Sequence, residues 1–269
     1  MFYEGTEKRL LICTHSLNLF DFDDQFWQQL VVNCGAEILS SIQNTQLKAY
    51  LLSESSLFVW QDKLLLITCG NTQLVRAALF LQQQLTKQQI STLIFQRHQA
   101  LKPQLQSSNF QQDRLLLEKQ FKGQQQHWRD SYQGDLFVFG EISEKNITTQ
   151  SIHMLHGLNG QLATQLQTET LDKQQILEKL KLDLFFDNLM IDHFSFEPKG
   201  YSLNAICGQD YLAIHLTPEQ LSTYLSIETS FSIEQCADFI GYLKQIFLPN
   251  DLKQLHFKSD NKQLNISVF

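Results

Sequence analysis

Two separated segments of the chain each carry a serine followed by a second reactive side chain. The pairs are Ser55 with Cys69, fourteen residues later, and Ser202 with His215, thirteen residues later. Residues that favour strands flank a Gln-Asp turn in each segment, so 51–69 and 201–216 are predicted to be β-hairpins. Hydroxyl, thiol and imidazole groups perform nucleophilic attack and proton transfer. If the hairpins occupy equivalent places in two related halves, the four side chains meet at one site.

Each of these residues also has an ordinary structural explanation when it is taken alone. The Ser-Glu-Ser-Ser run at 53–56 is typical of a bulge or a strand end wetted by hydroxyls. Cys69 alone would be a small core residue, and His215 a hydrogen-bonded core histidine. Ser202 alone would be a surface or bulge hydroxyl. The joint occurrence of these residues, rather than any one of them, favours a functional site.

Five separated blocks of the sequence resemble one known family, in the family's order and near its spacings. The blocks are 2–8, 52–56, 68–70, 196–204 and 214–219, and a weaker similarity continues through 226–229. Together they resemble the eukaryotic-type S-adenosylmethionine decarboxylase family, whose members are pyruvoyl enzymes. The segments between the blocks diverge strongly from the family.

The pattern of elements predicts an α+β fold of one domain, 1–269, with two related halves at about 1–125 and 135–269. Two antiparallel sheets are expected to pack face to face with helices outside. The resemblance implies the same four-layer αββα sandwich. A polar Gln/Gly stretch at 122–134 is the candidate boundary between the halves.

Helices are predicted from apolar periodicity and capping residues. They cover a segment opened by Asp23-Asp24, then 72–87 with Asn71-Thr72 as its cap, 109–121, 172–182 and 232–247. Outside the two hairpins, strands are expected at 9–19, 36–43, 47–53, 90–97, 135–141, 147–154, 161–168, 188–196, 222–229, 253–258 and 263–269.

Decarboxylation of an α-amino acid leaves a carbanion, and no standard side chain provides an electron sink for it. The resemblance implies that this chain makes a pyruvoyl group for the purpose. Ser55 would attack the carbonyl of Glu54 and convert the peptide bond into an ester. Ser202 would stabilise the oxyanion, and His215 would remove the Cα proton of residue 55. Elimination and hydrolysis would leave chains 1–54 and 55–269, the second beginning with the ketone.

Matched positions also imply the residues used in turnover. Cys69 would reprotonate the substrate Cα. Tyr3 and Phe196 would stack on the adenine, and Glu219 would bind the ribose hydroxyls. A sulfonium substrate gives ring faces a further purpose through cation–π attraction. The other expected contacts are Leu52 and Glu54 at the substrate, with Glu4 and Glu7 as acids near the site.

Composition narrows the class of protein. The 269 residues carry a net charge of −7, which argues against nucleic acid as the main partner. No apolar run reaches the roughly 18 residues that span a membrane, and no signal peptide is visible. Five cysteines without CxxC spacing suit free thiols in the cytoplasm. The spacing of His153-x-x-His156 could place two imidazoles on one helix face, but without nearby Cys or carboxylate ligands the pair predicts no metal site.

Activation by putrescine, known in animal members of the family, is not expected here. Leu11 and Ile67 stand where that site has a glutamate and a lysine, and Glu228 matches another of its acids. A homodimer of processed protomers is left open.

Two alternative functions also remain open. One is a pyruvoyl-dependent decarboxylase of arginine or ornithine, against which the adenine and ribose positions Tyr3, Phe196 and Glu219 argue. The other is an inactive regulatory paralogue, which would be expected to have lost Ser55, Cys69 or His215.

Overall fold

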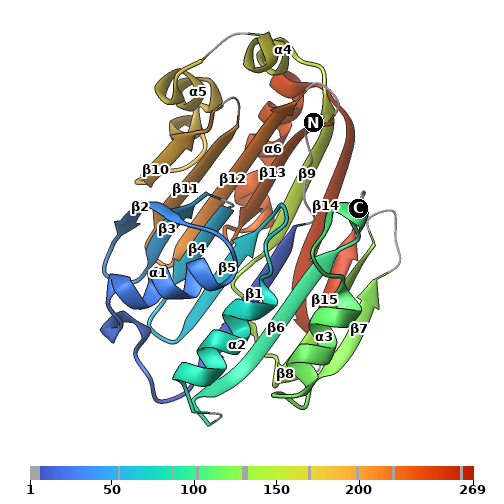
Figure 1. The fold of residues 1–269 in the computed structure, drawn as a ribbon. Coiled ribbons are helices and arrows are strands. Elements are labelled where there is room, and N and C mark those ends of the chain that lie inside the picture. Colours follow the sequence, from blue (N-terminus) through green and yellow to red (C-terminus); the bar gives the residue numbers. More distant parts are fainter. Residues whose placement is uncertain are drawn as a thin grey trace.

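Two antiparallel sheets lie face to face between two layers of helices (Figure 1). The computed structural model describes residues 7–53, 55–86, 88–100, 103–128, 133–168, 171–197, 200–219, 222–260 and 263–269. None of the helices within these ranges combines the length and the apolar character needed to cross a membrane.

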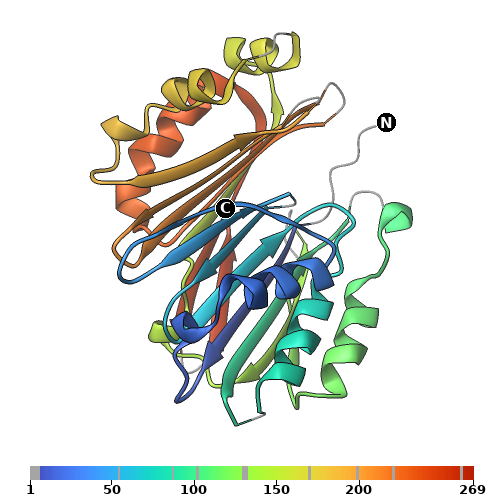
Figure 2. The same cartoon turned by 60° about the vertical axis from the view of Figure 1, so that its left-hand side comes forward.

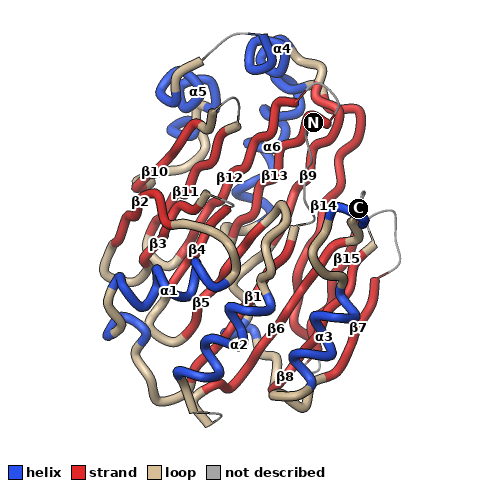
Figure 3. Tube along the Cα trace, viewed as in Figure 1, coloured by secondary structure: helices blue, strands red, loops and turns tan. Residues whose placement is uncertain are grey.

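The first sheet is built from the N-terminal half of the chain. Its strands are β1 (Lys8–Thr14), β2 (Ile38–Gln43), β3 (Lys48–Leu52), β4 (Ser55–Val59), β5 (Lys63–Thr68), β6 (Ile90–His98), β7 (Gln124–Trp128) and β8 (Gly134–Gly140). Their spatial order is β2-β3-β4-β5-β1-β6-β8-β7. Helices α1 (Asp24–Asn33), α2 (Val75–Gln84) and α3 (Phe110–Glu118) follow one another along its outer face (Figure 3). Short 3-10 helices cover Leu19–Asp21 and Pro103–Leu105.

The second sheet is built from the C-terminal half. Its strands are β9 (Ser151–Leu158), β10 (Met190–Ser195), β11 (Tyr201–Cys207), β12 (Asp210–Glu219), β13 (Ser222–Thr229), β14 (Pro249–Asp260) and β15 (Gln263–Val268). Their order is β10-β11-β12-β13-β9-β14-β15. Helices α4 (Gln161–Thr168), α5 (Lys173–Leu180) and α6 (Ile233–Phe247) lie on the opposite outer side of the molecule (Figure 2). Short 3-10 helices cover Glu144–Asn146 and Leu182–Leu184.

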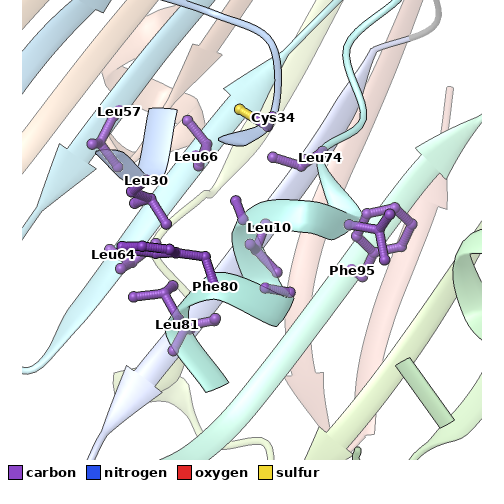
Figure 4. Packing of buried hydrophobic residues seen from close by; sticks show 14 of the residues in the cluster. Leu10, Leu30, Cys34, Leu57, Leu64, Leu66, Leu74, Phe80, Leu81 and Phe95 are labelled. Carbon is purple, nitrogen blue, oxygen red and sulfur yellow. The ribbon is translucent and has the colours of Figure 1, made fainter. Parts of the chain in front are cut away.

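Three apolar clusters hold the four layers together. In β1, Leu10 and Ile12 belong to the cluster beneath the first helix layer, whereas Leu11 and Cys13 belong to the cluster between the sheets. Successive side chains of a strand point to opposite faces, so a strand buried on both sides must be apolar throughout. Figure 4 shows the outer cluster, in which sheet leucines lie against residues of α1 and α2. A third cluster packs α4, α5 and α6 on the second sheet. This layering confirms the predicted αββα sandwich.

The two sheets repeat the same strand order, but the repeat is offset from the one expected. The series β2-β3-β4-β5-β1-β6-β8 matches β10-β11-β12-β13-β9-β14-β15 position by position. The hairpin 201–216 therefore corresponds to β3–β4, and not to the 51–69 hairpin that carries Cys69. The similar spacing of the two serine pairs does not arise from equivalent hairpins. The chain passes from the first sheet to the second between Gly140 and Ser151. This point lies after the 122–134 segment, because β7 and β8 complete the first sheet.

A glutamine side chain takes part in the N-terminal cap of three helices. Three helices start with a capping box, in which the N-cap side chain and a glutamine three residues later each accept from the other's backbone N–H. The pairs are Asn109 with Gln112, Asp172 with Gln175 and Ser232 with Gln235. Asp23 caps α1 as predicted, accepting from Phe26 N at 2.9 Å.

Three local predictions were wrong. Residues 161–168 form helix α4 rather than a strand, because Leu162, Ala163 and Leu166 share one helical face that packs on α6 and the second sheet. Thr72 does not cap α2, which begins only at Val75. His153 and His156 lie on β9, where an odd spacing puts them on opposite faces rather than on one helix face.

Two deeply buried histidines are expected to make stability depend on pH. Burial lowers the pKa of His98 to about 3 and that of His153 to about 4. In the unfolded chain each titrates near its ordinary value, so below about pH 6.5 only the unfolded state takes up the proton. The free energy of unfolding should therefore fall from about pH 6.5 to 4, by about 3 kcal/mol for each histidine, and these two residues add no dependence above pH 6.5.

Denaturant unfolding at a series of pH values measures this effect. His153→Gln should reduce the slope below pH 6.5, whereas substitution of the exposed His15 should leave it unchanged. An equal slope in His153→Gln and the unchanged protein would contradict the assignment.

Candidate active site

Ser55 is the first residue of β4, the strand that pairs with β3. In this pairing Leu52 lies opposite Ser55. Ser53 N donates to the Glu37 carbonyl at 2.9 Å, and Ser53 Oγ accepts from Glu37 N at 3.0 Å. Glu54, the expected partner in cleavage, lies outside the described residues. Ser55 and Ser56 of the polar run are the first residues of β4, so these hydroxyls lie at a strand end rather than in a bulge within a strand.

The backbone at Ser55 departs from the regular alternation of β4. Leu57 and Val59 belong to the cluster beneath the helices, so an unbroken strand would direct Ser55 to that side. Its φ is 141°, a conformation that residues other than glycine rarely adopt. The Ser55 hydroxyl nevertheless lies 3.0 Å from Nε2 of His215, which belongs to the opposite sheet. The strained backbone at Ser55 thereby allows its hydroxyl to point into the space between the sheets.

His215 connects hydroxyls from both sheets. Its Nδ1 lies 2.9 Å from Ser202 Oγ, directly across the β11–β12 pair, and its Nε2 faces Ser55. Desolvation by the surrounding residues lowers the pKa of this imidazole to about 4, so the ring is neutral at physiological pH. When Nδ1–H donates to Ser202, Nε2 is free to accept the Ser55 proton. This arrangement provides a base next to a nucleophile.

Cys69 is brought to the same end of the sheet by β5. Thr68 pairs with Ser55, and Cys69 is the next residue along the chain. Its turn is held by Lys8 Nζ, which donates to the Gly70 carbonyl at 2.8 Å, and by Thr72 Oγ1, which donates to the Cys69 carbonyl at 2.9 Å. Thr72, predicted as a helix cap, thus fixes the turn that carries the thiol.

Three of the other four cysteines are more deeply buried than Cys69. All five are free thiols. Burial raises the pKa of Cys13 and Cys34 to about 12 and that of Cys236 to about 11, which keeps these three protonated and unreactive. Cys69 is half-buried at a strand end.

Expected substrate residues are described only in part. Tyr3 and Glu4 lie outside the described residues, as does the side chain of Glu219, although its backbone ends β12. Phe196 is half-buried beside the ring of Phe194, 5.0 Å away between centroids, in the loop that leads into β11. Leu52 is fully buried in the cluster beneath the first helix layer, so its side chain does not face the space between the sheets.

Glu7 lies at the start of the first sheet and contacts the second. Its carboxylate accepts a hydrogen bond from the Tyr224 hydroxyl at 2.9 Å, and its side chain is buried. A second contact joins the same two sheets: the Arg9 guanidinium lies 2.8 Å from the Glu228 carboxylate, and both groups are buried. Within the described residues, no three His, Cys, Asp or Glu side chains are arranged to hold a metal ion.

Two residues near His215, Ser56 and Asn204, were not predicted as site residues. Ser56 Oγ donates to Asn204 Oδ1 at 2.6 Å and lies 3.4 Å from His215 Nε2. Both lie within the family-like blocks 52–56 and 196–204, and Asn204 lies two residues after Ser202 on the same face of a predicted strand, but neither residue was given a role.

Comparisons with known proteins agree over the length of the chain. A family model described as adenosylmethionine decarboxylase matches residues 1–268. Two similar curated proteins are the S-adenosylmethionine decarboxylase proenzymes of Trypanosoma cruzi and Drosophila melanogaster. The first is 28% identical over 92% of this chain and 73% of its own length, and the second is 26% identical over 92% and 80%. The crystal structure of Trypanosoma brucei AdoMetDC-delta26 monomer shares the fold, with a TM-score of 0.58 and 20% identity over 75% of this chain and 79% of that one.

Proposed function

The chain belongs to the adenosylmethionine decarboxylase family, and from this premise we propose that it makes its own pyruvoyl group by breaking the Glu54–Ser55 peptide bond. Decarboxylation of S-adenosylmethionine is the reaction of the family, and it supplies the aminopropyl donor for polyamine synthesis. The observation that carries the proposal is the contact of Ser55 Oγ with His215 Nε2 at 3.0 Å.

Self-cleavage begins with the two hydroxyls that flank His215. Ser55 Oγ attacks the Glu54 carbonyl while its proton passes to His215 Nε2, and Ser202 donates to the oxyanion. The C–N bond breaks, the nitrogen receives a proton and an ester remains. His215 then removes the Cα proton of residue 55, and elimination releases the Glu54 carboxylate. Water hydrolyses the dehydroalanine through its imine form to pyruvoyl and ammonia.

The residues present fit a pyruvoyl group at position 55. The serine that would form it is buried, with 4% of its surface exposed. It belongs to a strand of the first sheet, and its hydroxyl contacts His215 of the second. A pyruvoyl carbonyl supplies the electron sink that decarboxylation requires. Cys69 would deliver a proton to the substrate Cα, because its turn adjoins the strand that pairs with Ser55. Phe196 and Tyr3 would hold the adenine, Glu219 the ribose, and Glu7 and Glu4 would contribute negative charge.

Release of CO₂ from carboxyl-labelled S-adenosylmethionine by cleaved protein tests this function. Labelled arginine and ornithine should release none, and neither should compete with S-adenosylmethionine. Release from a basic amino acid in place of S-adenosylmethionine would contradict the proposal. An uncleaved, inactive chain would instead favour the regulatory alternative. A homodimer of processed protomers and a cytoplasmic location remain predictions.

Putrescine is expected to leave both cleavage and turnover unchanged. Glu228 Oε1 forms a buried ion pair with Arg9, and removing one partner of such a pair is strongly unfavourable. The apolar Leu11 and Ile67 stand where the diamine site has charged groups, so a diamine lacks these partners here. Rates of cleavage and of CO₂ release should therefore be equal with and without millimolar putrescine at matched ionic strength. Sodium chloride serves as the control for charge screening. A putrescine-specific acceleration would contradict this prediction.

A further inference from the structure

Two neighbouring serines have access to the same base. Ser55 Oγ lies 3.0 Å and Ser56 Oγ lies 3.4 Å from His215 Nε2. Ser56 shares a strand face with Phe58, which packs between the sheets, so regular alternation directs Ser56 toward His215. Ser55 reaches the same nitrogen only with a strained φ of 141°. Strand geometry alone therefore favours Ser56, and something else must make Ser55 the nucleophile.

The Asn204 amide has one orientation that satisfies its partners. Its second contact is with the Tyr50 carbonyl oxygen, 3.0 Å from Nδ2. A carbonyl oxygen can only accept, so the NH₂ group must face Tyr50 and Oδ1 must face Ser56. Since Oδ1 can only accept, the Ser56 hydroxyl is the donor in the 2.6 Å bond.

This bond occupies the only proton that Ser56 carries. Asn204 and Ser56 are both fully buried, so neither can exchange the partner for water. With its O–H directed to Asn204, Ser56 has no proton to transfer to His215. The Ser55 hydroxyl is then the one able to donate to Nε2.

We propose that Asn204 is a positioning residue that selects Ser55 over Ser56 as the nucleophile of self-cleavage. The inference rests on the proposed function and adds to it the residue that decides which peptide bond is broken. Without Asn204, Ser56 Oγ would transfer its proton to His215 and attack the Ser55 carbonyl. That attack would replace the Ser55–Ser56 peptide bond with an ester, and elimination or hydrolysis of the ester by water would then give chains 1–55 and 56–269.

The test follows cleavage during cell-free synthesis, with timed quenching and mass measurement of both fragments. In Asn204→Ala, cleavage at Glu54–Ser55 should slow by about tenfold or more, and a product beginning at residue 56 should appear. Adding Ser56→Ala to this variant removes the competing hydroxyl. The double variant should again cleave only at Glu54–Ser55, with most of its rate restored. A merely structural role for Asn204 would not be repaired by Ser56→Ala.

A second variant keeps the proposal testable if Asn204→Ala fails to fold. Asn204→Asp retains the shape and an acceptor oxygen for Ser56. Burial favours its neutral form, whose O–H can donate to the Tyr50 carbonyl, so this variant should keep cleavage at Glu54–Ser55 alone. Wild-type speed and position in Asn204→Ala would overturn the proposal, as would mixed cleavage in Asn204→Asp or in the double variant. Failure of the unaltered chain to cleave would instead refute the proposed function.

Discussion

Replacing Ser55 with alanine is expected to leave the chain uncut and without decarboxylase activity. No other described hydroxyl combines a position beside the scissile bond with a proton free for His215, because Ser56 donates to Asn204. Alanine can form neither the ester nor the ketone, so loss of activity should reach the detection limit. The variant should run on a denaturing gel as a single chain of 31.3 kDa.

Ser53→Ala is the matched control for this loss. Ser53 lies two residues before Ser55, but its hydroxyl accepts from the Glu37 backbone rather than facing His215. The control should still cleave at Glu54–Ser55, and both variants should retain the circular dichroism of the unaltered protein. Decarboxylation of S-adenosylmethionine by Ser55→Ala would show that residue 55 is not the source of the electron sink.

Replacing Cys69 with alanine should separate maturation from turnover. The proposed self-cleavage uses Ser55, Ser202 and His215, which contact one another, so Cys69→Ala is expected to mature. Loss of a positioned proton donor typically costs about 10²–10⁴-fold in rate, and the turnover number should fall by that amount. Failed protonation of the substrate Cα should also inactivate the enzyme progressively during turnover.

Cleavage and turnover must be measured on the same preparation to make this distinction. Cys207→Ala is the control, since Cys207 is a half-buried thiol at the end of β11 away from the turn of Cys69. It should mature and turn over normally. Unchanged turnover in Cys69→Ala would remove the thiol from the mechanism.

Much of the fold followed from local patterns in the sequence. Helix α6 was predicted at 232–247 and spans Ile233–Phe247, because its capping box and its apolar stripe are both local signals. Strands β4 and β5 were predicted from a short turn between two apolar runs. Helix α4 was misread as a strand, since eight residues with few turn signals fit either period.

The candidate site was predictable only where family blocks marked it. Ser55, Ser202 and His215 were named from those blocks, and the structure brings them together. The prediction that the hairpins 51–69 and 201–216 are equivalent was wrong, because the repeat relates β4 to β12 and β5 to β13. Asn204 lies within the block 196–204, but its role could not be inferred there, since its partners Ser56 and Tyr50 belong to the other sheet. Contacts across packed sheets depend on how the faces meet, which no local pattern encodes.

Mass spectrometry of the purified, denatured protein tests self-cleavage most directly. The account predicts two fragments, 1–54 and 55–269, the larger one lighter by the mass of ammonia than a serine-ended chain and able to react with phenylhydrazine. A single intact chain that does not react with phenylhydrazine would contradict it.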